Sequence, residues 1–103
     1  MDRELKKGIL EIFILASLIK ENSYGYKIIF TLKPLVEISE STLYPILRRL
    51  EAQGKLKTYN KLIDGRNRKY YEITKKGKKE VEEFIFEWDK IKNIYDILVG
   101  EVK

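Results

Sequence analysis

The 103-residue sequence contains no cysteine and no histidine. Without cysteine there is no disulfide and no thiolate ligand for zinc, and without histidine the chain lacks the commonest metal ligand and general base. Zinc enzymes and nucleophile–histidine pairs are therefore excluded. The only clustered carboxylates are the solvated run Glu80, Glu82 and Glu83, which forms no catalytic pair. We predict that the protein is not an enzyme and carries no cofactor.

Long apolar stretches are also missing. The longest one, residues 9–19, is interrupted by Glu11 and Ser17 and is well short of the ~20 residues that a membrane-spanning helix needs. It also lacks the cleavage pattern of a signal peptide. We expect no membrane partner and a cytoplasmic location.

The chain does have an excess of positive charge, and this charge is clustered. Residues 1–47 carry six Lys/Arg and six Asp/Glu, residues 48–79 carry twelve and three, and residues 80–103 carry three and seven, so the net charges are 0, +9 and −4. A positive field confined to one segment is the electrostatic footprint of a phosphate-binding surface. A scattered lysine excess would suit a solvated face instead, and the clustering argues against that alternative.

Apolar residues at helical spacing predict two helices before residue 35. The first, residues 5–20, is apolar on two faces, which fits either a contact with a partner subunit or a deep central helix. The second begins at a cap formed by Asn22-Ser23 and ends near Pro34. Gly25 in its first turn suggests that another backbone, or DNA, approaches closely there.

A third helix is predicted to start at Ser39 or Ser41 and to end at Gly54. Pro45 lacks the N–H group that would bond to the Ser41 carbonyl, so the helix start should be irregular. The hydroxyl-rich start carries the positive end of the helix dipole and suits phosphate oxygens and base edges. One of the two serines can also serve as an ordinary cap.

Two β-like runs, residues 56–62 and 68–73, flank an Asp64-Gly65 pair, which is a strong hairpin signal. Arg66, Arg68 and Lys69 lie at the tip. A cationic hairpin can lie along minor-groove phosphates, whereas lysines on an edge strand otherwise block aggregation.

A long helix is predicted after a cap at Thr74. Its first turn carries four lysines, whose positive charges are repelled by the positive N-terminal end of the helix dipole. An anion bound nearby would relieve this repulsion. Apolar residues then recur three and four apart as a heptad seam, which favours pairing with a helix of another chain. The seam consists of Val81, Phe84, Trp88, Ile91, Tyr95, Leu98 and Val102. For the predicted homodimer the interface residues are Leu5, Ile9, Phe84, Trp88, Ile91, Tyr95 and Leu98.

Between about Leu10 and Trp88 the sequence resembles the PadR family of bacterial and archaeal transcriptional regulators. The resemblance rests on Ser39-Glu40-Ser41-Thr42-Leu43-Tyr44-Pro45, Leu47-Arg48-Arg49-Leu50-Glu51, Gly54, Arg68-Lys69-Tyr70-Tyr71-Glu72-Ile73-Thr74 and Gly77. Ser23-Tyr24-Gly25-Tyr26 resembles the family's second-helix motif.

The resemblance implies an α+β, mainly α fold. A winged helix-turn-helix DNA-binding domain would span residues 1–74. A dimerisation helix would span residues 75–103 and form one compact unit with the N-terminal helix, as in the family's small subgroup.

By the same resemblance the protein is expected to be a sequence-specific regulator that binds double-stranded DNA, usually as a homodimeric repressor on a pseudo-palindromic operator. The implied DNA-binding residues are Tyr24, Gly25, Tyr26, Lys27, Ser39, Ser41, Thr42, Tyr44, Pro45, Arg48, Arg66, Arg68 and Lys69. The family often has histidine at the position of Tyr24 and glycine at that of Ser41, so the helix start should fit DNA differently here.

Some family members bind flat aromatic compounds between subunits near a tryptophan on the last helix. Trp88 matches that position, which makes it a candidate ligand pocket for a small aromatic effector. A tryptophan in a heptad seam is more often a core residue.

A competing function is a winged-helix protein-interaction adaptor that never reads DNA. It would explain the heptad and leave the charge of residues 48–79 unexplained.

Overall fold

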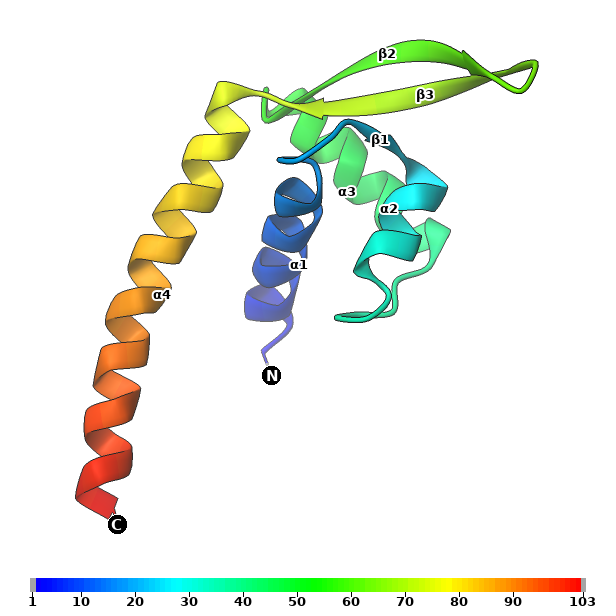
Figure 1. Ribbon diagram of the computed structural model, residues 1–103. Helices are drawn as coiled ribbons and strands as arrows, with labels where there is room; N and C mark the ends of the chain where they lie inside the picture. The colour runs from blue at the N-terminus through cyan, green and yellow to red at the C-terminus, as the bar shows by residue number, and fades with distance from the viewer. Residues whose placement is uncertain (1, 103) are drawn as a thin grey trace.

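The computed structural model describes residues 2–102, which form four helices and one three-stranded antiparallel sheet (Figure 1). The predicted mainly helical α+β fold is confirmed. Residues 1 and 103, the outer ends of the two predicted segments, lie outside the described residues. The elements are α1 (Arg3–Ser17), β1 (Ser23–Tyr24), α2 (Gly25–Leu32), α3 (Glu40–Ala52), β2 (Leu56–Ile63), β3 (Arg66–Ile73) and α4 (Lys75–Val102).

The start of α2 differs from the prediction. Asn22-Ser23 does not cap this helix, because Ser23 and Tyr24 form β1 and pair with Tyr71 and Tyr70 of β3. Tyr24 precedes α2 without any capping side-chain hydrogen bond. The local capping pattern contains no information on strand pairing, and here the backbone of Ser23 and Tyr24 pairs with β3 (residues 66–73) instead.

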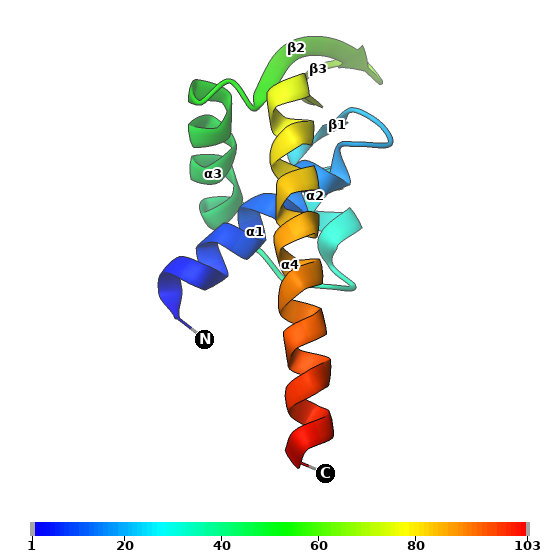
Figure 2. The same ribbon diagram turned by 90° about the vertical axis from the view of Figure 1, so that its left-hand side faces the viewer.

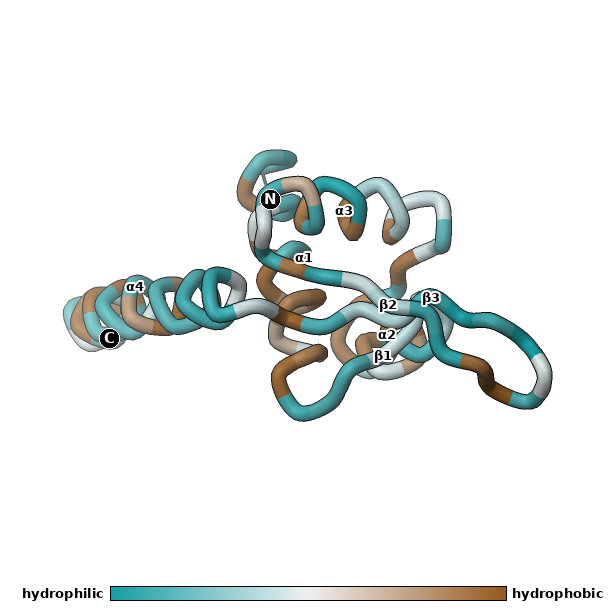
Figure 3. The backbone as a smooth tube through the Cα atoms, turned by 90° about the horizontal axis from the view of Figure 1, so that it is seen from above, coloured by the Kyte–Doolittle hydropathy of each residue, from teal (hydrophilic) through white to brown (hydrophobic). Residues whose placement is uncertain are grey.

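The hairpin prediction is confirmed, with longer strands. Asp64 and Gly65 both have positive φ (50° and 76°), as a two-residue type I′ turn requires. The register then runs from Ile63 opposite Arg66 to Leu56 opposite Ile73. The hairpin projects from the helices as a wing (Figures 1 and 3).

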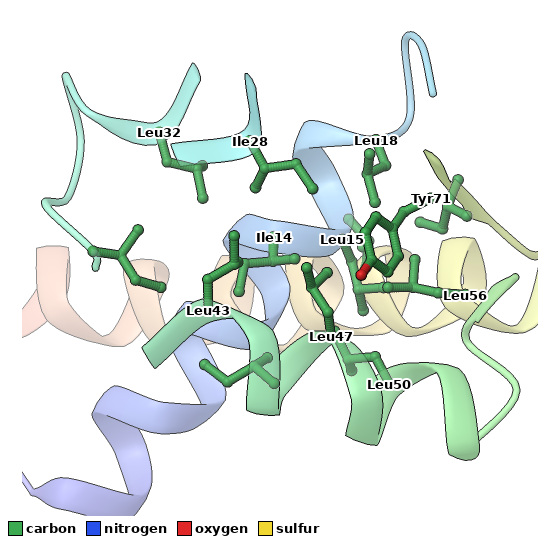
Figure 4. Packing of buried hydrophobic residues seen from close by; sticks show 14 residues of the cluster. Ile14, Leu15, Leu18, Ile28, Leu32, Leu43, Leu47, Leu50, Leu56 and Tyr71 are labelled. Carbon is green, nitrogen blue, oxygen red and sulfur yellow. The ribbon is translucent and has the colours of Figure 1, made fainter. Parts of the chain in front are cut away.

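The core lies where α1, α2, α3 and the sheet converge (Figure 4). α3 contributes Leu43, Leu47 and Leu50, which are fully buried and recur at helical spacing. Burying such a side chain contributes roughly 1.5–3 kcal/mol. The core residues labelled in the figure are Ile14, Leu15, Leu18, Ile28, Leu32, Leu43, Leu47, Leu50, Leu56 and Tyr71. This packing buries one face of α3 and leaves the opposite face exposed to solvent.

The end of α3 is joined tightly to the start of α4. Gly54 has φ +76° and ends α3 as predicted. Thr74 donates through Oγ1 to the Gly54 carbonyl (2.7 Å) and accepts from the N–H of Gly77 (3.2 Å), which confirms it as a cap. Lys55 Nζ lies 2.7 Å from a Glu80 carboxylate oxygen. Lys76 Nζ donates to the carbonyl of Gln53 (2.7 Å).

The Lys76 contact changes the expectation for the first turn of α4. We predicted an external anion near its four lysines, but one of them already faces the negative end of the α3 dipole. Only Lys75, Lys78 and Lys79 remain candidates for contact with a phosphate.

α4 runs beside α1 at first and then extends well past the other elements (Figures 1 and 2). Val81 is buried against the domain, whereas the seam farther along is open: Ile91 is 48% exposed and Leu98 57%. No helix within residues 2–102 combines the length and apolar character that crossing a membrane requires.

The first prediction concerns the packing of Gly77. A Cβ here would overlap the Lys55 carbonyl oxygen and lie 2.7 Å from Cγ1 of Ile73. Gly77→Ala should lower the free energy of unfolding by about 1–3 kcal/mol, the usual cost of overpacking, measured by urea denaturation. The control is Gly100→Ala, since nothing lies within 4 Å of that position. Equal stability of the two variants would contradict the proposed contact.

Candidate nucleic-acid interface

The free face of α3 carries polar and basic residues. Ser41, Thr42, Pro45 and Arg48 are all exposed and recur at helical spacing opposite the buried leucines. Ser39 is the cap: its Oγ accepts a hydrogen bond from the N–H of Thr42 (3.3 Å) and lies 3.0 Å from Oγ of Ser41. The helix therefore begins with a cluster of hydroxyl groups at the positive end of its dipole.

A groove lies between the start of α2, the middle of α3 and the wing. We call it the basic groove, since three of its side chains are cations. It is lined by Tyr24, Gly25, Tyr26, Tyr44, Arg48, Asn67, Arg68, Lys69 and Tyr71. Seven of these nine residues were predicted from the sequence.

Two lining residues were missed, Asn67 and Tyr71. Both lie on β3 together with Lys69 at a spacing of two, so they share one face of the strand. This alternation was the sequence signal that could have identified them. Tyr71 is also buried in the core cluster, and this burial raises its pKa.

The close approach predicted at Gly25 is present, but a side chain makes it. A Cβ on Gly25 would overlap the hydroxyl and ring of Tyr44. The neighbour is therefore not another backbone, because an aromatic ring from α3 fills the space; the approach of DNA at Gly25 stays a prediction. The small residue lets α2 and α3 approach each other at the floor of the groove.

Arg68 is held by an aromatic ring. Its guanidinium carbon lies 4.7 Å from the centroid of Tyr24, a cation–π arrangement. Tyr24 in turn lies 5.5 Å from the centroid of Tyr70. The Nε atom of Arg68 is buried and has no hydrogen-bond partner within residues 2–102. The arginine is therefore oriented by stacking against the Tyr24 ring at the edge of the basic groove.

Two other predicted cations already have carboxylate neighbours. Lys69 Nζ lies 3.6 Å from Glu51, and Lys27 Nζ lies 2.9 Å from Glu21. Both lysines are partly exposed, and exposed pairs of this kind contribute little to stability. They can exchange the carboxylate for a phosphate at small cost.

The remaining predicted residues lie outside the groove. Ser39, Ser41, Thr42 and Pro45 belong to the α3 start, and Arg66 is exposed at the wing tip. Lys27 is on α2 and does not line the groove. The predicted DNA-binding residues thus lie in the basic groove, at the start of α3, on α2 and at the wing tip.

Glu40, which we did not single out from the sequence, lies at the same face. It is the first residue of α3 and is exposed. Hydrogen bonding to its carboxylate, followed by the negative charge itself, raises the pKa of Tyr26. Glu40 at the start of α3 therefore lies near enough to Tyr26 at the start of α2 to influence its ionisation.

A second groove separates α1 from α4 and contains residues predicted for a dimer interface. Leu5, Ile9, Phe84 and Trp88 line it, and the rings of Phe84 and Trp88 have centroids 5.6 Å apart. Ile91, Tyr95 and Leu98 lie farther along α4 and are exposed.

These surfaces define a class of protein. A helix whose exposed start carries hydroxyls and an arginine, beside a cationic two-stranded wing, is a winged helix-turn-helix. Within residues 2–102, no group of three or more Asp, Glu, His or Cys side chains could hold a metal ion.

Comparisons with known proteins agree with this class. Residues 14–83 match the transcriptional regulator PadR-like family. The Lysinibacillus sphaericus protein named "Uncharacterized protein X" is 33% identical over 101 residues, which are 93% of this chain and 93% of that protein.

Two crystal structures are also similar. A Streptococcus mutans protein is 44% identical with a TM-score of 0.81, covering 91% of this chain and 89% of its own. A PadR family transcription regulator from Clostridium difficile is 33% identical with a TM-score of 0.79, covering 87% of this chain and 97% of its own.

The chain therefore belongs to the PadR-like family of transcriptional regulators. It is a transcription regulator and not an enzyme, as the sequence predicted.

The second prediction tests the contact between Tyr26 and Glu40. Because the folded state favours the neutral phenol, this contact stabilises the fold below about pH 10 and is lost as the pH rises through the raised pKa. In an NMR titration followed at the ring carbon that bears the hydroxyl, Tyr26 should titrate above its ordinary value. Glu40→Gln should bring the pKa back toward about 10. The same pKa in both proteins would refute the contact.

Proposed function

We propose that this protein is a homodimeric repressor that binds a pseudo-palindromic DNA operator. The observation that carries the proposal is that the exposed start of α3 and the basic groove adjoin on one side of the molecule. A duplex lying there would meet hydroxyl groups, three cations and the wing together.

In this proposal α3 is the recognition helix and enters the major groove. Arg48 and Tyr44 would reach base edges, while Ser39, Ser41 and Thr42 contact bases or the adjoining phosphates. Arginine binds the O6 and N7 atoms of guanine in a bidentate manner, and this is the commonest specific contact. Specificity would therefore depend mainly on α3.

The wing and the start of α2 would bind the phosphate backbone. Arg68 is oriented by Tyr24 and lines the basic groove, Lys69 and Lys27 have exchangeable carboxylate neighbours, and Arg66 is at the tip. The net charge of +9 on residues 48–79 supports this assignment, because phosphate contacts supply most of the affinity for DNA in general.

The dimer would form along α4. Its seam beyond Val81 is largely exposed in the single chain, and so large an apolar surface is costly in water. Leu5 of α1 is also 47% exposed and lies across a groove from Trp88. Residues 75–103 would thus serve as the dimerisation helix and residues 1–74 as the DNA-binding domain.

Two copies related by a two-fold axis would place their recognition helices about 34 Å apart, in successive major grooves. A dimer bound in this way near a promoter would block transcription, and it would act in the cytoplasm, where a bacterial or archaeal chromosome lies.

We also propose that Trp88 is the contact for any small aromatic effector. Trp88 is 37% exposed and lies beside Phe84 in the groove between α1 and α4, so a flat ring could stack there. Because the partner's helix would close the same groove, effector binding would be coupled to the geometry of the dimer.

The alternative function, a protein-interaction adaptor that does not read DNA, predicts no binding to duplexes at low ionic strength. A gel shift with fragments of the gene's own upstream region separates the two functions. The basic groove favours DNA, because an adaptor that uses only α4 has no need of Arg48, Arg68 and Lys69 together.

The third prediction concerns affinity and specificity for DNA. If ~6 phosphates are neutralised, affinity should fall on the order of 10³-fold between 50 and 200 mM salt, measured by fluorescence anisotropy.

Arg48→Ala should weaken operator binding about tenfold more than random-DNA binding. Lys69→Ala should weaken both alike and reduce the salt dependence.

Lys92→Ala on α4 removes the same charge far from the groove and should leave both affinities unchanged. A flat salt response of the unmodified protein would contradict DNA binding. Equal losses on operator and random DNA for Arg48→Ala would contradict its role in specificity.

The fourth prediction concerns the dimer. Leu98→Glu places a carboxylate in the seam and should raise the dimer dissociation constant by at least about 100-fold, because a charge would have to be buried. Sedimentation velocity over a range of concentrations measures this. Ile97→Glu is the matched control, since Ile97 is similarly exposed but lies ~100° around the helix from Leu98, away from the seam. A stable Leu98→Glu dimer would exclude the seam as the interface.

A further inference from the structure

The wing carries two cations directly opposite each other. Lys61 of β2 pairs in register with Arg68 of β3, so their side chains leave the sheet on the same face. Among residues 2–102, neither side chain has a carboxylate oxygen within 4.0 Å. Like charges directly opposite on antiparallel strands are destabilising. The wing therefore contains a repulsion that no ion pair within the described residues relieves.

The other two lysines of the hairpin each have a carboxylate nearby. Lys57 is opposite Glu72 in the same register, and its Nζ lies 3.6 Å from a carboxylate oxygen of Glu72. Lys69 lies 3.6 Å from Glu51. The arrangement at Lys61 is thus specific to its place in the wing and does not follow from the lysine content of the hairpin.

Both cations lie over tyrosine rings. Nζ of Lys61 is 5.2 Å from the ring centroid of Tyr70, and the Arg68 guanidinium lies over Tyr24; both are cation–π arrangements. The centroid of Tyr70 lies 5.5 Å from that of Tyr24 and 5.6 Å from that of Tyr59. We call Tyr24, Tyr59 and Tyr70 the tyrosine stack. One ring comes from each strand of the sheet.

The tyrosine stack is held by the fold. Tyr70 is buried, Tyr24 pairs with it between β1 and β3, and the hydroxyl of Tyr59 accepts a hydrogen bond from Nδ2 of Asn22 (3.0 Å). Rings held in this way restrict the positions of Lys61 and Arg68. Aromatic faces attract cations but carry no net charge, so both positive charges remain available to an anion.

Protection of the sheet edge does not explain the pair. β2 is an edge strand, and lysines on edge strands block aggregation. That role requires only an exposed charge, which Lys57 supplies on the same strand. It requires neither a second cation opposite the lysine nor aromatic rings beneath both.

We propose that Lys61 and Arg68 together bind a single phosphate of the DNA backbone and that the tyrosine stack positions them. This inference rests on the proposed function, to which it adds Lys61 as a DNA contact. Arg68 also lines the basic groove, so a duplex lying there would place its backbone beside the pair. A phosphate between the two side chains would offset their repulsion with two attractions. Tyr59 and Tyr70 are positioning residues in this scheme.

The experiment measures DNA affinity and thermal stability for Lys61→Met, which keeps an unbranched side chain and removes the charge. Fluorescence anisotropy with a random duplex should give an affinity about tenfold lower, the scale of one charged hydrogen bond. The free protein at low salt should melt roughly 1–5 °C higher, because one of two opposed charges is gone. A lysine with a structural role alone would not change affinity and stability in opposite directions.

Lys57→Met is the matched control, because Lys57 lies on the same strand and face but has Glu72 as a neighbour. It should keep the affinity within about twofold and should not raise the melting temperature. The double variant Lys61→Met/Arg68→Met should reduce the slope of log affinity against log salt by about one, as for one phosphate. A reduction by about two would indicate two separate phosphates and overturn the shared site.

The positioning role is tested with the tyrosines. Tyr70→Phe keeps the ring and should retain the affinity, whereas Tyr70→Leu removes it and should weaken binding about as much as Lys61→Met. Because Tyr70 is buried, Tyr59→Leu provides a second test at a side chain that is 38% exposed. It should weaken binding about threefold, the scale of one aromatic pair. Unchanged affinity in both leucine variants would refute the positioning role.

The outcomes separate this inference from the function on which it rests. If the unmodified protein binds duplexes with a steep salt dependence and Lys61→Met binds them equally well, the phosphate site is wrong and the proposed function stands. If the unmodified protein binds no duplex even at low ionic strength, the proposed function is wrong and this inference with it.

Discussion

The arrangement of the molecule depends on the contact between the end of α3 and the start of α4. Here Thr74 binds the Gly54 carbonyl, Lys76 binds the carbonyl of Gln53 at the C-terminal cap of α3, and Gly77 lets Lys55 approach without a side chain between them. This contact fixes the angle between α3 and α4. If α4 carries the partner and α3 the DNA, a small rotation here would change the distance between the two half-sites.

A second feature is that some basic side chains pair with groups of the fold, whereas others line the proposed DNA-binding surface. Arg49, Lys55 and Lys76 bind groups of their own chain and hold α3 against α1 and α4. Arg48 and Arg68 line the basic groove, and neither has a carboxylate oxygen within 4.0 Å among residues 2–102. The net charge of a segment therefore overstates the number of groups that can meet phosphate, since some neutralise carboxylates within the fold.

Much of the site could be predicted from the sequence, because it follows from local patterns. The hydroxyl-rich helix start, the Asp64-Gly65 turn and the Thr74 cap each depend on residues a few positions apart, and all three are present. The errors concern contacts distant in sequence. Ser23 looked like a cap but pairs with β3. The approach at Gly25 is made by Tyr44, nineteen residues later.

By itself the sequence determined the elements, the clustered positive charge and the apolar seam of the last helix, since helical period, strand alternation and turn chemistry are local properties. Only the tertiary structure decided which residues share the basic groove and which cations are already paired. Such facts depend on how α2, α3 and the wing pack together, and packing brings together side chains that no spacing along the chain relates.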